Sequence, residues 1–286
     1  MSENWFEEIS FKGQMKQGYK VSRHLHKEQS KYQTIEVLET EAVGKLLLLD
    51  GKTMVSEADE FVYHEVMAHI PYMVCPKVER VLIIGGGDGG VVREFTRHKD
   101  IKEIQLVEID ERVIEVSKQF FPECTSGLSD SRVKILPQDG IQYVKDCKAN
   151  GEKFDIIIVD STDPEDFAAG LFTQEFYGNI NDILTDHGIM MNQTENPFYD
   201  EYGLKSIYQN LKDSFKNVQS FNAPMIIYPG VFWTFGFSSK STNALDLIES
   251  KIDSMREIQK TLKWYNMDWH KGAFALSNYQ RAKLGL

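Results

Sequence analysis

The residues from Gly85 to Gly90 constrain the fold most, because they read Gly-Gly-Gly-Asp-Gly-Gly between an apolar run and a helical pattern. The apolar run, residues 81–84, is short and rich in β-branched side chains, which is typical of a buried strand. A G-x-G-x-x-G spacing that follows a strand and opens a helix is typical of nucleotide and nucleoside sites in doubly wound α/β sheets. The sequence therefore predicts a nucleoside pocket beside this turn.

The pattern around the turn predicts the rest of the sheet. After Pro76, helical segments alternate with short apolar runs at 81–84, 104–107, 133–136, 156–159 and 189–191. Such alternation is typical of crossover βαβ units and predicts a Rossmann-like, doubly wound α/β sheet covered on both faces. Residues 1–58 instead show strand-like alternation and the hairpin signal Asp50-Gly51. We therefore expect a small N-terminal β domain at 1–58 and a Rossmann-like catalytic domain at 59–286.

Composition and charge exclude several classes of binding partner. The chain has 286 residues, 42% hydrophobic and 26% charged, as is typical of a globular protein of about two domains. Its net charge of −11 argues against nucleic acid and against an anionic membrane surface. Glu3, Glu7 and Glu8 lie where a signal peptide would be basic and then apolar, so we expect a cytoplasmic protein with no membrane partner. Three widely spaced cysteines without a C-x-x-C pair predict neither a disulfide framework nor a zinc site.

Two carboxylates indicate which nucleoside would bind. Glu108 ends the next predicted strand, about 20 residues after Gly87, where a carboxylate accepts both ribose hydroxyls. Asp88 lies inside the turn, where a dinucleotide would place its pyrophosphate, and its charge disfavours a phosphate there. A cation is favoured instead, which points to S-adenosylmethionine or a derivative that carries a sulfonium and an ammonium group. The alternative interpretation of Asp88 is a helix cap.

Further carboxylates follow later strands. Asp139 comes after the run at 133–136, and Asp160 and Asp163 come after the run at 156–159. Because parallel strands release their carboxyl ends into one crevice, these three should converge with Asp88 and Glu108. Each one alone could be a turn or cap residue, but five at one edge predict a cationic ligand.

These motifs are distributed over nearly the whole chain and resemble the spermidine synthases, a family of aminopropyltransferases. Those at strand ends are Gly85–Gly90, Val107–Asp110, Gln138–Gly140 and Asp160–Pro164. The others are Lys31–Gln33, Leu49–Gly51, Asp59–Glu65, Trp264–Tyr265 and His270–Lys271.

The resemblance implies a reaction and an assembly. Decarboxylated S-adenosylmethionine would donate an aminopropyl group to putrescine, giving spermidine and methylthioadenosine. It would act as a co-substrate, with no cofactor and no metal. The resemblance also implies a sheet of the S-adenosylmethionine-dependent methyltransferase type and a homodimer or homotetramer.

The resemblance also implies roles for individual residues. Asp160 would be the general base, Tyr63 would assist by hydrogen bonding to the amine, and Asp88 and Asp163 would bind the aminopropyl ammonium. The donor and its nucleoside would be held by Gln33, Gly85, Gly87, Asp88, Glu108, Asp139 and Gly140. The polyamine site would be formed by His64, Asp88, Asp160, Asp163, Gln193 and Tyr228.

Three other interpretations stay open at this point. The acceptor is cadaverine, agmatine or a longer polyamine; the chain is a methyltransferase that uses S-adenosylmethionine itself; or it is a non-catalytic polyamine or nucleoside sensor. A zinc site is not expected, because His64 and His69 are five residues apart instead of the four of a helical zinc pair.

Two segments depart from the family pattern. Residues 165–170 lack the Gly-Pro-Ala of the loop that closes over the substrates, and Phe167 takes the place of its proline. Residues 223–230 are longer than the corresponding family segment and lack its threonine and serine. Because the second segment lines the acceptor end, we expect amine selectivity to follow least directly from the resemblance.

Overall fold

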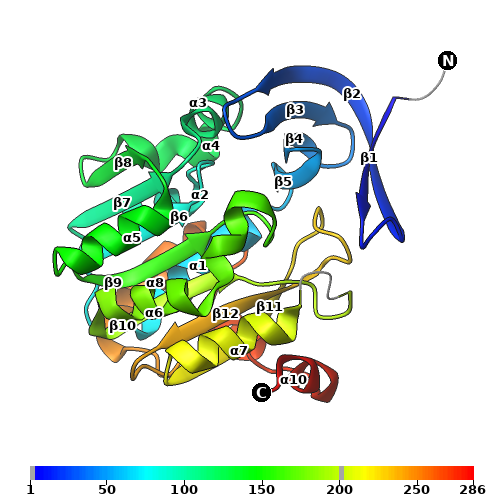
Figure 1. The fold of residues 1–286 in the computed structure, drawn as a ribbon. Coiled ribbons are helices and arrows are strands. Elements are labelled where there is room, and N and C mark those ends of the chain that lie inside the picture. Colours follow the sequence, from blue (N-terminus) through cyan, green and yellow to red (C-terminus); the bar gives the residue numbers. More distant parts are fainter. Residues whose placement is uncertain (1–3, 200–202) are drawn as a thin grey trace.

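The computed structural model describes residues 4–199 and 203–286, and it contains two sheets (Figure 1). The first has five antiparallel strands that pair in chain order: β1 (Trp5–Ser10), β2 (Met15–Gln29), β3 (Thr34–Thr40), β4 (Gly44–Leu49) and β5 (Lys52–Ser56). The predicted hairpin is present and joins β4 to β5. Its two turn residues, Asp50 and Gly51, both have positive φ, at 48° and 77°, as a tight hairpin turn requires.

The second sheet has seven strands in the order β11-β12-β10-β9-β6-β7-β8. Five of them are parallel: β6 (Arg80–Gly85), β7 (Glu103–Glu108), β8 (Val133–Pro137), β9 (Phe154–Asp160) and β10 (Leu184–Gln193). This confirms the predicted doubly wound sheet. Two antiparallel strands that the sequence did not predict, β11 (Asn217–Pro224) and β12 (Phe232–Ser239), extend it beyond β10.

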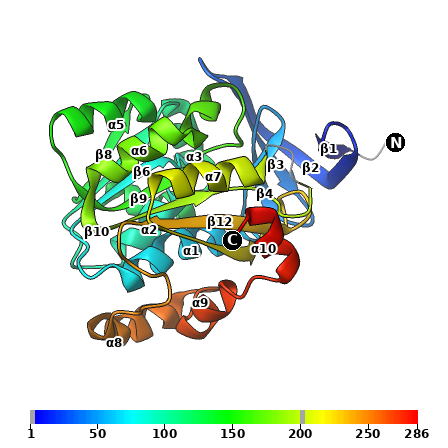
Figure 2. The same ribbon diagram turned by 60° about the horizontal axis from the view of Figure 1, so that its bottom comes forward.

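Helices cover both faces of this sheet (Figure 2). Alternate residues of β6 supply the two cores: Val81 and Ile83 pack into one, and Leu82 and Ile84 into the other. The first core includes α1 (Glu60–Val74), α2 (Gly90–Thr96), α8 (Glu249–Ile258) and α9 (Met267–Ala273). The second includes α5 (Gly140–Ala149), α6 (Gln174–Ile183), α7 (Leu204–Ser214) and α10 (Asn278–Leu284).

The five-stranded sheet closes the carboxyl edge of the larger one. Leu47, Leu49 and Val55 pack against Val113 of α3 (Glu111–Phe120), near the short helix α4 (Pro122–Thr125). On the other side, Ile227, in the connection between β11 and β12, packs among side chains of β2, β3 and β4. The crevice at the strand ends is therefore walled by both sheets. Within residues 4–199 and 203–286, no helix has the length and apolar character that a membrane span requires.

Candidate active site

A cavity occupies the carboxyl edge of β6, β7 and β9, where the carboxylates were expected to meet. It brings together most of the predicted site residues: Gln33, Tyr63, His64, Gly85, Gly87, Asp88, Glu108, Asp139, Gly140, Asp160 and Tyr228. Two predicted residues are not in its lining. Asp163 lines an adjoining pocket with Glu8, Lys52 and Trp233, and Gln193 is buried beneath the loop that follows β9.

The glycine turn approaches the end of β9 closely. Gly85 and Gly86 both have positive φ, at 79° and 70°. A Cβ at Gly85 would lie 2.0 Å from the Asp160 backbone oxygen, and one at Gly86 would lie 2.8 Å from Asp160 Oδ2. The first glycines of the motif are therefore required by the position of Asp160 as well as by the turn.

The end of the cavity at Glu108 is held by backbone donors. Glu108 is 8% exposed, and its carboxylate accepts hydrogen bonds from the backbone N–H of Gly87 at 3.2 Å and of Asp110 at 2.9 Å. Burial raises the pKa of Glu108 to about 7. A carboxylate removed from water in this way gains from further donors, and ribose hydroxyls are such donors.

Two other residues frame the same end. Asp139 caps α5, since its Oδ1 accepts from the backbone N–H of Ile141 at 2.8 Å. A Cβ at Gly140 would lie 2.4 Å from a methyl group of Ile84, so α5 begins directly against β6. Gln33 donates to Asp110 Oδ2 at 3.0 Å and thereby ties the loop between β2 and β3 to the end of β7.

Asp88 is both a cap and a charged group. Its Oδ1 accepts from the backbone N–H of Gly90 at 2.8 Å and lies 3.0 Å from His64 Nε2. Burial acts against ionisation of Asp88, but the charge of His64 lowers the pKa of that carboxyl. Burial likewise opposes charge on His64, yet Asp88 and Glu60 together raise the pKa of His64 to about 10. The cavity therefore presents an ionised Asp88 at neutral pH.

Asp160 is the second carboxylate of this part of the cavity. Tyr63 donates its hydroxyl hydrogen bond to Asp160 Oδ1 at 2.7 Å, while Oδ2 is shielded from solvent and has no partner among the described residues. Burial and the nearby charge of Asp88 raise the pKa of Asp160 to about 7. Such a carboxyl group exchanges protons near neutral pH.

The end of the cavity at Tyr228 is formed by aromatic rings and loop residues. Tyr228 packs edge-on against Trp233 at 4.9 Å between ring centroids, and its hydroxyl donates to the Met54 carbonyl at 3.3 Å. Gln193 accepts from Trp233 Nε1 at 3.1 Å and donates to the Ser161 carbonyl at 3.3 Å. Gln193 thus supports Trp233, which packs behind Tyr228 at this end of the cavity.

Asp163 has a partner that the sequence did not reveal. Lys52 Nζ lies 3.6 Å from Asp163 Oδ2 and 2.5 Å from Glu165 Oε2. Burial raises the pKa of Asp163 to about 6 in spite of this contact. The loop that carries Asp163 continues as a 3-10 turn over Asp166–Phe172, and the expectation for Phe167 concerns a side chain outside those described.

Possible metal ligands near the cavity are already engaged. Glu60, His64 and Cys124 place ligand atoms within 4.8 Å of one another. Arg93 contacts both oxygens of Glu60, at 3.0 and 2.8 Å, and supplies the positive charge that a metal would bring. His69 instead contacts His98 at 3.0 Å and Glu94 at 3.1 Å.

Comparison with known proteins decides the family. Residues 60–248 match the family described as Spermine/spermidine synthase domain. The chain belongs to the spermine/spermidine synthase family. Residues 4–57, which contain the five-stranded sheet, match the family described as Spermidine synthase tetramerisation domain. The resemblance inferred from the motifs is therefore confirmed, as are the fold class and the assignment to the aminopropyltransferases.

Relatives within the family are similar to this chain in sequence over most of their length. A polyamine aminopropyltransferase of Alkaliphilus metalliredigens (strain QYMF) is 43% identical over 268 residues, 93% of each chain. One of Clostridium botulinum (strain Eklund 17B / Type B) is 43% identical over 262 residues, 91% of this chain and 90% of its own. A solved spermidine synthase in complex with the transition state analogue AdoDATO superposes with a TM-score of 0.93 at 35% identity, covering 100% of this chain and 96% of its own. The spermidine synthase of Thermotoga maritima has a TM-score of 0.92 at 36% identity, covering 100% and 95%.

Proposed function

We propose that this family member transfers the aminopropyl group of decarboxylated S-adenosylmethionine to putrescine, giving spermidine and methylthioadenosine. The acceptor nitrogen attacks the aminopropyl carbon that is bonded to the sulfonium sulfur, and the C–N bond forms as the C–S bond breaks. The electron pair returns to sulfur, which leaves as a neutral thioether. Because the sulfonium is itself a good leaving group, decarboxylated S-adenosylmethionine is a co-substrate and the reaction requires no further cofactor.

The observation that carries the proposal is the pair of Asp160 and Tyr63 in an acidic cavity beside the glycine turn. We assign Asp160 as the general base that takes the ammonium proton of the acceptor, and Tyr63 as the group that orients it. Asp160 Oδ2, which has no hydrogen-bond partner in the part of the chain that the structure describes, supports this assignment, since a shielded carboxylate oxygen gains from a cationic donor.

The energetics of proton removal agree with this role. An alkyl ammonium with a pKa near 10.4 costs roughly 4 to 5 kcal/mol to present as the neutral amine at pH 7. A carboxylate whose pKa is raised to about 7 accepts that proton more readily than an ordinary aspartate does. Alignment of nitrogen, carbon and sulfur for in-line displacement supplies about 7 to 11 kcal/mol more.

For the donor, we propose that Asp88 binds the aminopropyl ammonium and that the nucleoside is held by Gln33, Gly85, Gly87, Glu108, Asp139 and Gly140. Asp163 would contribute to ammonium binding once its contact with Lys52 is exchanged for a substrate amine. His64 would act on the polyamine through Asp88, because both of its ring nitrogens already contact carboxylates. Gln193 and Tyr228 would shape the acceptor end.

We propose that the chain assembles as a homodimer or homotetramer through its N-terminal sheet. The match of residues 4–57 to a tetramerisation domain supports this. Strand β1 also exposes two large apolar side chains, Trp5 at 50% and Ile9 at 62%. Sedimentation analysis of the full chain measures the state directly.

The test of the function is release of methylthioadenosine from decarboxylated S-adenosylmethionine, with putrescine, cadaverine, agmatine and spermidine supplied separately. Products are identified by mass, and a reaction without amine measures background hydrolysis. We expect preference for putrescine and a single aminopropyl transfer. Preference for another amine would move the acceptor assignment, and no release with any amine would overturn the transfer itself.

A further inference from the structure

His64 lies between two carboxylates and is almost completely buried, with 2% of its surface exposed. Its Nδ1 is 2.6 Å from Glu60 Oε2 and its Nε2 is 3.0 Å from Asp88 Oδ1. Two ionised carboxylates only accept hydrogen bonds, so both ring nitrogens donate and the ring is an imidazolium. Among the described residues, the His64 ring and the Gly90 N–H both contact Asp88 through Oδ1, so Oδ2 is the oxygen left for a ligand cation.

The last glycine of the turn is shaped by this ring. A Cβ at Gly90 would lie 2.1 Å from His64 Nδ1 and 2.2 Å from Cε1. Gly90 has no positive φ, so an alanine would fit its backbone conformation, and the three heavy atoms nearest to its Cβ would all belong to the His64 ring. Gly90 is therefore needed for the His64 ring, whereas Gly85 and Gly86 are needed for Asp160.

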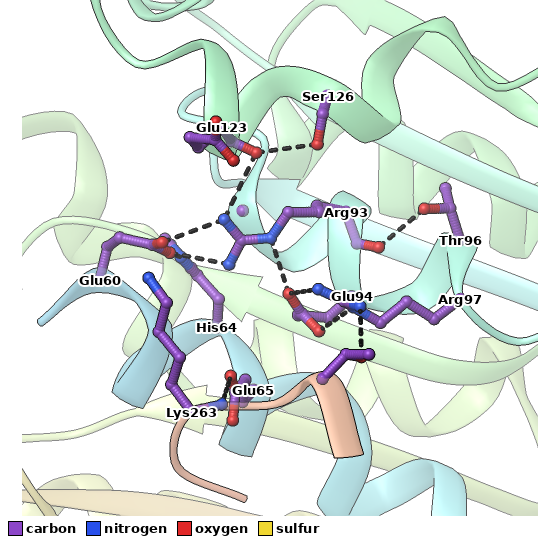
Figure 3. A network of polar contacts seen from close by, with 12 residues as sticks. Glu60, His64, Glu65, Arg93, Glu94, Thr96, Arg97, Glu123, Ser126 and Lys263 are labelled. Carbon is purple, nitrogen blue, oxygen red and sulfur yellow. Dashed lines mark hydrogen bonds and ion pairs between the residues drawn. The ribbon is translucent and has the colours of Figure 1, made fainter. Parts of the chain in front are cut away.

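Arg93 fixes the other side of Glu60 (Figure 3). Its two terminal nitrogens donate to Glu60 Oε1 at 3.0 Å and Oε2 at 2.8 Å. Its Nε donates to Glu94 Oε1 at 2.7 Å, and Glu94 is fully buried. A guanidinium held at both ends in this way leaves the Glu60 carboxylate little freedom to rotate.

The spacing of these groups follows from the two helices. Glu60 lies four residues before His64 on α1, so both side chains lie on one face of that helix. Arg93 lies at the middle of α2, which begins at Gly90. The chain Arg93, Glu60, His64 and Asp88 therefore connects the packing of α1 and α2 to the cavity, and we call it the positioning chain.

We propose that Glu60, Arg93 and Gly90 are positioning residues for the donor: they hold the His64 imidazole against Asp88 Oδ1, so that Oδ2 is aimed at the aminopropyl ammonium. The proposal rests on the proposed function only in naming that ammonium as the ligand. It predicts that damage to the positioning chain weakens binding of decarboxylated S-adenosylmethionine and spares methylthioadenosine, which has the same nucleoside but lacks the ammonium.

Arg93→Gln distinguishes a positioning role from a simple charge effect, because the two predict opposite changes in donor affinity. Loss of a positive charge near the cavity would by itself strengthen binding of a cationic donor. Loss of positioning weakens it, and we expect a decrease of about tenfold, which corresponds to about 1.4 kcal/mol. The matched control is Arg97→Gln, which removes the same charge one turn further along, where Arg97 contacts Glu94 and not Glu60.

Gly90→Ala tests the positioning chain without any change of charge. We expect about a tenfold loss of donor affinity in the wild-type background and less than about a twofold loss in a His64→Ala background, where the clash is absent. A merely structural role for Gly90 would give equal losses in both backgrounds.

Calorimetric titration of the purified full-length variants with decarboxylated S-adenosylmethionine and with methylthioadenosine provides all of these readouts. Binding of methylthioadenosine also reports that each variant is folded. If Gly90→Ala does not fold, Arg93→Gln decides the matter, and unchanged or tighter donor binding in Arg93→Gln would overturn the proposal. Wild-type protein that fails to bind the donor would instead refute the proposed function, so the two failures are distinguishable.

Discussion

The part of the cavity proposed for the donor (the donor end) lies on the ends of strands, whereas the part proposed for the acceptor (the acceptor end) lies on the connections between them. At the donor end, Glu108 and Asp139 are held by backbone N–H groups at the end of β7 and the start of α5. At the acceptor end, Asp163 and Tyr228 lie on irregular segments that follow β9 and β11. Their contacts, with Lys52 and with the Met54 carbonyl, come from the other sheet.

The two ends of the cavity differ in how strongly the fold fixes the positions of their side chains. The hydrogen bonds of a parallel sheet fix where its strands end, so a carboxylate at that point has the same position whatever the loops do. Loop residues tolerate insertion and exchange more readily than strand ends do. We therefore expect the donor to be fixed by the fold and the acceptor to be the variable property.

The largest effect of a substitution on turnover is expected at Asp160, where the two ends of the cavity meet. Asp160→Asn keeps the shape of the residue but removes the proposed base, so kcat should fall by about 10² to 10⁴ fold while donor binding persists. Since removal from water and Asp88 raise the pKa of Asp160 to about 7, wild-type activity should fall as the pH drops below about 7 and the carboxylate is protonated.

The control for this change is Asp253→Asn, which removes the same charge from a side chain that is 92% exposed on α8. Stopped assays of methylthioadenosine release over pH 5 to 9 measure both variants. Turnover by Asp160→Asn near the wild-type rate would remove Asp160 from the role of base.

A smaller effect, on the affinity for methylthioadenosine, is expected at Glu108 in the donor end. Burial raises the pKa of Glu108 to about 7, so the group is increasingly protonated as the pH falls below that value. A protonated carboxyl accepts fewer hydrogen bonds from ribose, and wild-type affinity for methylthioadenosine should therefore weaken by up to about tenfold per pH unit below about 7. Glu108→Gln should bind more weakly, by about 10 to 100 fold, and without this pH dependence.

Calorimetry at pH 6, 7 and 8 checks the second prediction. Asp139, which has the neighbouring position and is exposed, offers the comparison, because Asp139→Asn should leave the pH dependence in place. A wild-type affinity that does not change with pH would contradict the assignment of Glu108 to the ribose.

The donor end was largely predictable from the sequence, because its signals are local. The glycine turn, the strand before it and the carboxylates after each strand are read from short patterns, and the structure brings Asp88, Glu108, Asp139 and Asp160 to one cavity. The fifth carboxylate, Asp163, lines the adjoining pocket instead, where it contacts Lys52.

What the sequence did not reveal depends on contacts between distant segments. The pairing of Lys52 with Asp163 and the support of Trp233 by Gln193 arise only when the two sheets and β12 are in place. The strands β11 and β12 lack the alternation with helices that identified the others. Glu60 could have been found, because it lies four residues before His64 in a helical segment, a spacing typical of paired side chains.

Binding of decarboxylated S-adenosylmethionine, compared with that of intact S-adenosylmethionine, tests the donor end most directly. The extra carboxylate of the intact compound would meet the ionised Asp88, and like charges at short range cost several kcal/mol. We predict that calorimetry shows at least about 100-fold tighter binding of the decarboxylated compound. Equal or tighter binding of intact S-adenosylmethionine would contradict the assignment of Asp88 to the ammonium and would point to methyl transfer.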